Sequence, residues 1–201
     1  MKNATMIATF SSLPGLMAGI KDFFPSKLIL VVGRNESAEN EFIGNETMLK
    51  KTFGSITDIS RVEVEDEKDA YTVAKKVLEL IGKEKGKGNE VILNVCEGSK
   101  TQPISLLLAA YAAGKSVRKI LYTTLNRNEI VQIPRMGVKL SKSKKSLLLV
   151  IANNPGMNIS RISRKIKKTR AIIYRHLNEL EELGLVNDGY EITEAGRLVI
   201  G

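Results

Sequence analysis

Strand-like and helix-like runs alternate through the first 114 residues of this 201-residue chain, and their alternation restricts its fold more than any other feature. Four short runs rich in branched apolar residues are typical of strands: residues 5–10, 27–33, 59–65 and 90–95. Four longer runs are typical of helices: residues 13–24, 44–54, 69–82 and 102–114. Because parallel strands need a long crossover between them, such repeated units predict an α/β fold with a parallel sheet covered by helices.

Two further strand-like runs, residues 117–124 and 129–134, flank the polar segment 125–128. This pattern predicts a β-hairpin that closes the sheet, as a variant of the doubly wound fold. Residues 135–145 contain no apolar period and end in a lysine cluster, which indicates a domain boundary near residues 135–142. We therefore expect one domain over residues 1–137 and a second over residues 138–201.

The second domain has the pattern of a winged helix-turn-helix. Helix-like runs cover residues 144–152, 158–166 and 170–184, and Gly184 is placed to end the third. Thr169 is a suitable N-cap for that third helix. Its predicted buried stripe recurs every three or four residues: Ile173, Leu177, Leu180 and Leu183. Residues 185–193 carry Asp188-Gly189, which predicts two short strands, so the third helix is placed to enter a DNA major groove.

The basic residues of the chain are concentrated in this second domain. The formal net charge is +9, and residues 142–175 contain ten Lys and Arg but no Asp or Glu. Such a tract favours a double-stranded DNA partner, although a solvated face on a protein-binding winged helix is the alternative. Arginine can read guanine, and the lysines near the turn are expected to contact phosphate. The predicted DNA-contacting residues are Lys165, Lys167, Lys168, Thr169, Arg170, Ala171, Tyr174 and Arg175.

Composition excludes several other classes of protein. The chain has one cysteine, Cys96, and one histidine, His176, too few for an intramolecular disulfide or a Cys/His zinc site. We expect no metal, and His176 is expected to pack rather than to react. The longest apolar stretches are far below the ~20 residues that span a bilayer. No signal peptide is recognised at the start, so we expect a cytoplasmic protein with no membrane association.

The segment "NVCEGSKTQP", residues 94–103, links a predicted strand to a predicted helix. Exposed backbone N–H groups at such a turn, together with a lysine, can hold phosphate, although Gly, Ser and Thr can also serve turn geometry alone. The segments "TFSSLPG" and "GRNES" end two other predicted strands at the same edge of the sheet. The predicted ligand-binding residues are Thr9, Phe10, Ser11, Ser12, Gly33, Arg34, Asn35, Asn94, Cys96, Glu97, Gly98, Ser99, Lys100 and Thr101. Neither a P-loop nor a G-x-G-x-x-G motif is present, so ATP hydrolysis and dinucleotide redox chemistry are not supported.

Two stretches resemble known families. "NVCEGSK" resembles the Asn-x-Thr-Gly-Gly-Thr-Lys motif of CRISPR-associated Rossmann fold (CARF) domains at Asn94, Gly98 and Lys100, and conservatively at Ser99. Cys96 stands where that motif has threonine, and Glu97 where it has glycine. "ISRISRKIKKTRAIIYRHLNELEELGLV" resembles the winged-helix regulators of bacteria and archaea. The combination is similar to the archaeal Csa-type CRISPR-associated regulators.

This resemblance implies a homodimer that holds a cyclic oligoadenylate, of tetra-adenylate size, between its CARF domains, with no other cofactor. The ligand would alter the separation of the two winged helices on a palindromic promoter. Some CARF domains cut their ligand, but the first 137 residues contain no histidine to act as a base, so we expect no enzymatic activity. The alternatives are a ring nuclease with a tethered winged helix and an adaptor whose winged helix binds protein.

Overall fold

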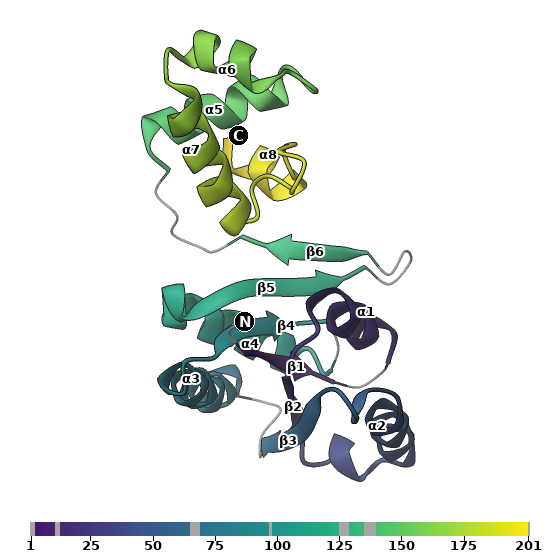
Figure 1. The fold of residues 1–201 in the computed structure, drawn as a ribbon. Helices are drawn as coiled ribbons and strands as arrows, with labels where there is room; N and C mark the ends of the chain where they lie inside the picture. The colour runs from purple at the N-terminus through teal and green to yellow at the C-terminus, as the bar shows by residue number, and fades with distance from the viewer. Residues whose placement is uncertain are drawn as a thin grey trace. The chain divides into compact units, whose positions relative to one another are not determined.

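The computed structural model describes residues 3–10, 13–64, 69–96, 98–124, 129–134 and 140–200, without the side chains of Glu36, Glu194 and Leu198. The chain divides into two compact units, Met1–Gln132 and Ile133–Gly201 (Figure 1). The division falls a few residues before the expected boundary at residue 137. Each unit has its own hydrophobic core and is described by itself.

The first unit is built on a six-stranded sheet with the order β3-β2-β1-β4-β5-β6. The strands are β1 (Ala4–Thr9), β2 (Lys27–Gly33), β3 (Asp58–Val64), β4 (Glu90–Asn94), β5 (Val117–Thr123) and β6 (Ile130–Ile133). Strands β1 to β5 pair in parallel. Strand β6 returns antiparallel to β5, and the Thr124 N–H donates to the Glu129 carbonyl over 2.9 Å beside the turn. The predicted α/β fold with a closing hairpin is confirmed.

Helices cover both faces of this sheet (Figure 1). They are α1 (Pro14–Phe23), α2 (Asn40–Phe53), α3 (Ala70–Gly86) and α4 (Thr101–Ala113), with short 3-10 turns at Glu36–Ala38 and Gly114–Ser116. Side chains of α1 and α2 share one core cluster with alternate residues of β1 and β2, such as Met6 and Leu28. Helices α3 and α4 pack together on the other face. Since β1 and β2 are buried on both faces, their apolar runs are nearly unbroken.

One buried carboxylate joins the amino ends of the central strands. Glu84 of α3 is 1% exposed and accepts hydrogen bonds from Thr5 Oγ1 at 3.0 Å and Asn89 Nδ2 at 2.7 Å. It also forms ion pairs with Lys27 Nζ and Lys87 Nζ, each at 3.1 Å. Burial raises the pKa of Glu84, but these four donors outweigh burial and lower the pKa to about 2. Sequence analysis missed this residue, although it continues the apolar stripe of Val73, Val77 and Ile81.

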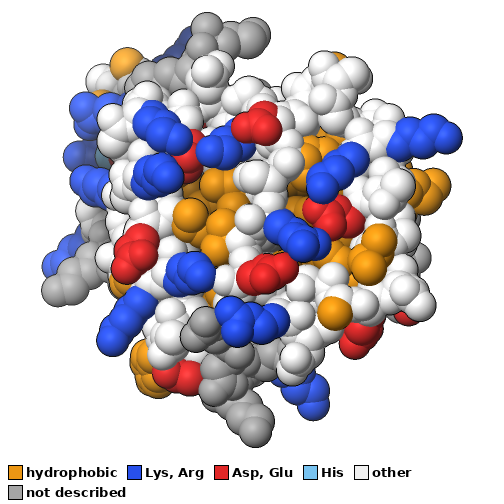
Figure 2. Space-filling model, turned by 90° about the horizontal axis from the view of Figure 1, so that it is seen from below, with side chains coloured by type: hydrophobic (Ala, Val, Ile, Leu, Met, Phe, Trp, Pro, Cys, Tyr) orange, Lys and Arg blue, Asp and Glu red, His pale blue; other side chains and the backbone are white. Residues whose placement is uncertain are grey.

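The outer edge of the sheet, at β3, is protected by charged side chains. Arg61 of β3 contacts Glu46 Oε2 and Glu63 Oε1, each at 3.2 Å, and Glu46 is only 6% exposed. Figure 2 views the molecule from the side on which α2, β3 and α3 lie and shows Lys, Arg, Asp and Glu side chains dispersed across apolar surface. Charges on an edge strand oppose its pairing with another chain.

The second unit contains α5 (Lys142–Ala152), α6 (Ile159–Ile166), α7 (Arg170–Glu182) and α8 (Glu194–Ile200). The first three begin at residues whose side chains cap the helix: Ser141, Asn158 and, as predicted, Thr169. Gly184, with φ 73°, lies just beyond the end of α7. Ile173, Leu177 and Leu180 are fully buried in the core of this unit.

The C-terminal end of this unit differs from expectation in two ways. The predicted pair of strands is reduced to one antiparallel bridge between Val186 and Ile192, and the additional helix α8 follows it. Asp-Gly predicts a turn with left-handed central residues. Instead, the residue in the left-handed region is Tyr190, with φ 60°, and its N–H donates to the Asn187 carbonyl over 2.9 Å. We refer to residues 186–192 as the wing.

Candidate functional site

The first candidate site lies at the carboxyl ends of β1, β2 and β4. The order of the strands reverses between β1 and β4, where Ala8 pairs with Asn94. Consecutive loops therefore leave the sheet in opposite directions at this point, which is where open α/β sheets bind ligands. Strand β2 lies next to β1, with Thr9 paired to Val31, so the loop that begins at Arg34 leaves the same edge of the sheet. The structure thus brings together the three strand ends that sequence analysis singled out.

The loop between β4 and α4 is held close to β1 by a glycine. Gly98 has φ 101°, a left-handed conformation that side chains disfavour. A Cβ atom at this position would lie 2.1 Å from Gln102 Oε1 and 3.4 Å from Thr9 Cβ. Lys100 follows at the N-cap position of α4 and is exposed. The loop therefore presents backbone and a cation beside the positive end of a helix, a combination suited to an anion.

Three of the predicted ligand-binding residues have buried side chains. Phe10 is 0% exposed and packs edge-to-face against Phe42, with ring centroids 5.3 Å apart. Thr9 and Asn94 are each 1% exposed. Asn94 packs against α1, because a Cβ at Gly19 would lie 2.6 Å from Asn94 Nδ2. These side chains support the strand ends from within the unit.

Cys96 connects the loop between β4 and α4 to β5. Its Sγ accepts from the Thr123 N–H at 3.0 Å and contacts Asn94 Oδ1. The Thr123 hydroxyl in turn donates to the Gly15 carbonyl of α1 over 2.9 Å. A small polar side chain at position 96 thus connects the end of β4 to β5 and, through Thr123, to α1.

Of the other predicted ligand-binding residues, Gly33 is the last residue of β2 and Thr101 is the first of α4. Arg34, Asn35 and Lys100 are exposed, and the Arg34 carbonyl accepts from Ser37 Oγ at 2.8 Å. Ser99 Oγ is buried, and the described part of the chain offers it no hydrogen-bond partner. Ser11, Ser12 and Glu97 fall outside the described residues. Within the described ranges, no cluster of three or more His, Cys, Asp or Glu side chains could hold a metal ion.

The second candidate site is the exposed side of α6 and α7. All eight predicted DNA-contacting residues are exposed, because the apolar stripe of α7 faces the opposite way. Lys167 and Lys168 form the turn between the two helices, and Lys167 ends α6 in the left-handed conformation with φ 56°. Lys165 Nζ donates to Asn154 Oδ1 over 3.3 Å, so this lysine is partly held by the turn after α5.

The second half of α7 is acidic and connects to α5. Lys144 Nζ contacts Glu179 Oε2 at 2.8 Å, and His176 Nδ1 lies 3.4 Å from the same oxygen. The hydrogen bond from Lys144 is the main cause that lowers the pKa of Glu179. His176 is mostly covered, as expected for a packing residue.

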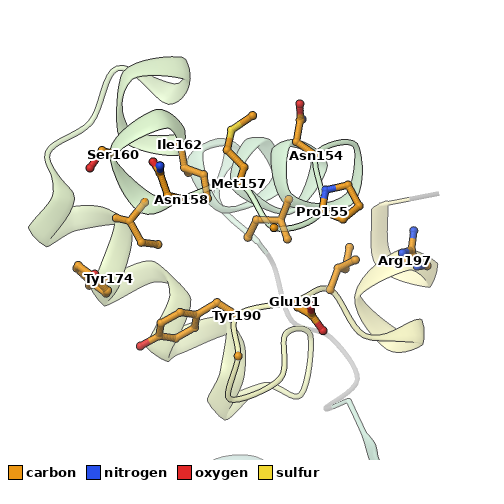
Figure 3. Close-up of a pocket in the computed structure, with 15 residues that line it drawn as sticks. Asn154, Pro155, Met157, Asn158, Ser160, Ile162, Tyr174, Tyr190, Glu191 and Arg197 are labelled. Atoms are coloured by element: carbon orange, nitrogen blue, oxygen red, sulfur yellow. The ribbon is translucent and has the colours of Figure 1, made fainter.

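A pocket of about 650 Å³ lies beside α7 (Figure 3). Its walls come from the turn between α5 and α6, the first half of α6, α7, the wing and α8. Ile151, Ile162 and Ile192 supply apolar walls, and Tyr174 and Tyr190 lie at the α7 side. Tyr174, predicted to contact DNA, therefore also contacts the wing.

Comparison with known proteins identifies both units. Residues 17–127 match the family model described as HFX_2341_N-like, N-terminal, which is more than half of the chain. The chain belongs to this family. Residues 141–188 match the model of the arsR family of bacterial regulatory proteins, so this family member carries an ArsR-type helix-turn-helix. No curated protein sequence matches the chain.

Solved structures show the same fold at low identity. A type III CRISPR defence DNA nuclease activated by cyclic oligoadenylate matches with a TM-score of 0.52 and 14% identity, over 96% of this chain and 32% of that one. Can2 from Sulfobacillus thermosulfidooxidans, in complex with cyclic tetra-adenylate, matches with a TM-score of 0.50 and 15% identity, over 98% of this chain and 57% of that one. Enterococcus italicus Csm6, bound to cyclic hexa-2'-fluoro-hexa-dAMP, matches with a TM-score of 0.56 and 10% identity, over 89% of this chain and 54% of that one.

These matches show the fold of the chain and nothing beyond it. The family member spans about a third of the length of the first structure and a little over half of the other two. Its N-terminal unit has a CARF-like fold, as the motif around Asn94 predicted. Over the described residues, no helix has the length and apolar character needed to cross a membrane.

Proposed function

We propose that this protein is a DNA-binding transcription regulator whose CARF-like unit senses a cyclic oligoadenylate, as a homodimer in the cytoplasm. The observation that carries the proposal is the exposed, acid-free basic surface of an ArsR-type helix-turn-helix in the same chain as a CARF-like sheet. Such a pairing makes sense if a ligand on one unit controls DNA binding by the other. The likeness to archaeal Csa-type CRISPR-associated regulators belongs to the same proposal.

The DNA half of the proposal assigns separate roles to the basic residues. Arg170 and Arg175 are exposed on α7, which is the helix that enters the major groove in this motif. Arginine can donate to both acceptors of guanine, whereas Lys167 and Lys168 at the turn neutralise phosphates. A two-fold symmetric dimer would place two such helices on a palindromic promoter.

Fluorescence anisotropy with a duplex selected from a random-sequence pool tests the DNA half. Replacing Arg170 or Arg175 by alanine is expected to weaken binding of the selected duplex about tenfold or more, since a bidentate pair discriminates by ~1–3 kcal/mol. Lys83→Ala, an exposed lysine of α3, is the matched control and should bind as the parent does. Equal affinity of all three variants would show that α7 is not the recognition helix.

The ligand half rests on the three loops at the β1–β4 crevice. Arg34 and Lys100 supply positive charge there, Gly98 allows close approach of backbone, and Ser99 has a hydroxyl without a described partner. A multiply charged cyclic nucleotide fits this chemistry. We assign the tetra-adenylate because two-fold related pockets suit a ring of four equal units; Can2, which has a similar fold, was solved with that ligand.

Calorimetric titration with cyclic tri-, tetra- and hexa-adenylate tests the ligand half. Heat is expected with the tetra-adenylate, and Lys100→Ala should lower the affinity about tenfold, because it removes one charge-assisted contact. Lys115→Ala is the matched control, since Lys115 is exposed just after the other end of α4. Heat that is absent for all three rings would refute the sensor while leaving DNA binding intact.

We also propose that the protein binds its ligand without cutting it. The first 137 residues contain no histidine, and the sole histidine, His176, is mostly covered and contacts Glu179. Incubation with labelled cyclic tetra-adenylate should return the intact ring. Linear products would instead favour the ring nuclease.

A further inference from the structure

The charge of the second unit changes sign within α7. Residues 142–175 carry ten Lys and Arg and no acid, whereas residues 176–196 carry no Lys or Arg and six acids. The acids are Glu179, Glu181, Glu182, Asp188, Glu191 and Glu194. The change falls immediately after Arg175, so the first half of α7 attracts phosphate and its second half, together with the wing, repels it.

The wing also lacks the groups that read a minor groove. Proteins use Arg, Lys, Asn and Gln for that purpose. The wing has no cation, and its exposed carboxylates are Asp188 and Glu191. The amide of Asn187 is already committed within the turn, since its Oδ1 accepts from the Glu191 N–H at 2.8 Å and its Nδ2 donates to Glu191 Oε2 at 3.4 Å.

The wing instead contacts the recognition helix. The hydroxyl of Tyr190 donates to Asn178 Oδ1 over 3.1 Å, and its ring meets that of Tyr174 edge-to-face with centroids 6.2 Å apart. Figure 3 shows the Tyr190 ring directed from the wing toward α7. Tyr190 has φ 60°, an unfavourable conformation for a bulky residue, and such conformations persist where surrounding contacts impose them.

We propose that the wing supports the recognition helix and does not read DNA, so that the described part of the second unit contacts DNA through the major groove and adjacent phosphates and not through the minor groove. This inference rests on the proposed DNA binding. Tyr190 is a positioning residue in it: it holds Tyr174 and Asn178 on the exposed side of α7. Asp188 and Glu191 give the wing no positive charge that could pair with phosphate.

Dimethyl sulfate footprinting of the full chain on the selected duplex separates the two grooves, because the reagent methylates guanine N7 in the major groove and adenine N3 in the minor groove. Protection of guanine N7 without protection of adenine N3 is expected. Protection of adenine N3 beside the half-sites would overturn the inference while DNA binding stands. Failure to retain any duplex would refute the proposed DNA binding itself, and the inference with it.

Substitutions in the wing test the inference independently. Asp188→Asn and Glu191→Gln should change DNA affinity less than about threefold and leave its salt dependence unchanged, because charges beyond a Debye length of ~10 Å are screened. Lys168→Gln should lower the salt slope by about one. A large rise in affinity for either wing variant would place the wing against DNA and overturn the inference.

A double-mutant cycle then examines the Tyr190–Asn178 contact. Tyr190→Phe and Asn178→Ala are each expected to weaken specific binding about three- to tenfold without changing the salt slope, and the double variant should lose no more than one of them. Additive losses, or no loss with Tyr190→Phe, would overturn the positioning role. Tyr190→Phe keeps the ring, so the edge-to-face contact and the fold are retained.

Discussion

Single residues with unusual environments carry much of the local structure of this protein. Glu84 is a carboxylate buried at the amino ends of three strands, and Gly98 is a left-handed residue at their carboxyl ends. Substitution at either position should lower stability. Replacing Glu84 would leave buried hydrogen-bond donors unsatisfied, and a side chain at position 98 would collide with Gln102. Each leads to a prediction about stability.

Glu84→Gln should lower the free energy of unfolding of the first unit by about 3 kcal/mol at neutral pH, because it breaks the two ion pairs of a buried carboxylate with partly exposed lysines. The folded pKa of about 2 lies below the ordinary 4.5. The parent therefore has this stabilisation in full above pH 4.5 and loses it as the pH falls toward 2. Urea unfolding followed by circular dichroism at several pH values measures both effects. Glu79→Gln, exposed on the same helix, should match the parent.

Gly98→Ala should destabilise the loop between β4 and α4 by about 1–3 kcal/mol, because residue 98 has a left-handed conformation and its Cβ would lie 2.1 Å from Gln102 Oε1. Gly88→Ala isolates the first cause, since Gly88 has φ 81° but no atom within 4 Å of its Cβ position. Hydrogen exchange of the β4–α4 loop should report a larger effect for Gly98. Equal effects at the two sites would mean that the loop yields to the clash without cost.

In the second unit, the turn between α6 and α7 affects both the stability of the unit and the charge of its surface. The turn from α6 to α7 places Lys167 in the left-handed region, and its position is fixed by the Lys168 N–H, which donates to the Ser163 carbonyl over 3.1 Å. Glycine would fit the conformation better, but this chain has a lysine at this point. In the proposed complex with DNA, this lysine contributes a phosphate contact and makes the turn less stable than glycine would.

Lys167→Gly should therefore stabilise the second unit by about 0.5–1 kcal/mol while weakening DNA binding and lowering its salt slope by about one. Thermal unfolding and anisotropy at several salt concentrations measure the two effects on one variant. Lys142→Gly is the control, since Lys142 lies at the first position of α5 in an ordinary helical conformation. Its replacement by glycine should destabilise the second unit. If Lys167→Gly bound DNA with unchanged affinity and salt dependence, Lys167 would not belong to the DNA-contacting surface.

At the scale of the whole molecule, the proposed function requires that two units of different chemistry be coupled. The sheet of the first unit brings the exposed cations Arg34 and Lys100 to one edge, and the ArsR-type helices carry an exposed basic surface. Coupling between two sites of this kind is reciprocal, because a ligand that changes DNA affinity must have its own affinity changed by DNA to the same extent.

Sedimentation should show a homodimer, and cyclic tetra-adenylate should change the affinity for the selected duplex by about 5–150-fold. Anisotropy measured with and without the ring tests this, and titration of the ring in the presence of DNA should show the same factor. A monomer, or equal DNA affinity with and without the ring, would contradict the coupling. Lys100→Ala should bind DNA normally but lose the response.

The sequence by itself determined the α/β class, the closing hairpin, the order of the helices and the basic tract, because periodicity, capping residues and charge are local properties. It also indicated which strand ends carry polar residues. Only the tertiary structure decided that Asn94 and Phe10 are buried and that Glu84 joins three strands. It also decided that Val186 and Ile192 form a single bridge, with Tyr190 against α7. Those outcomes depend on contacts between residues far apart in the chain or on packing that overrides a local turn preference, and neither is written in any short stretch of sequence.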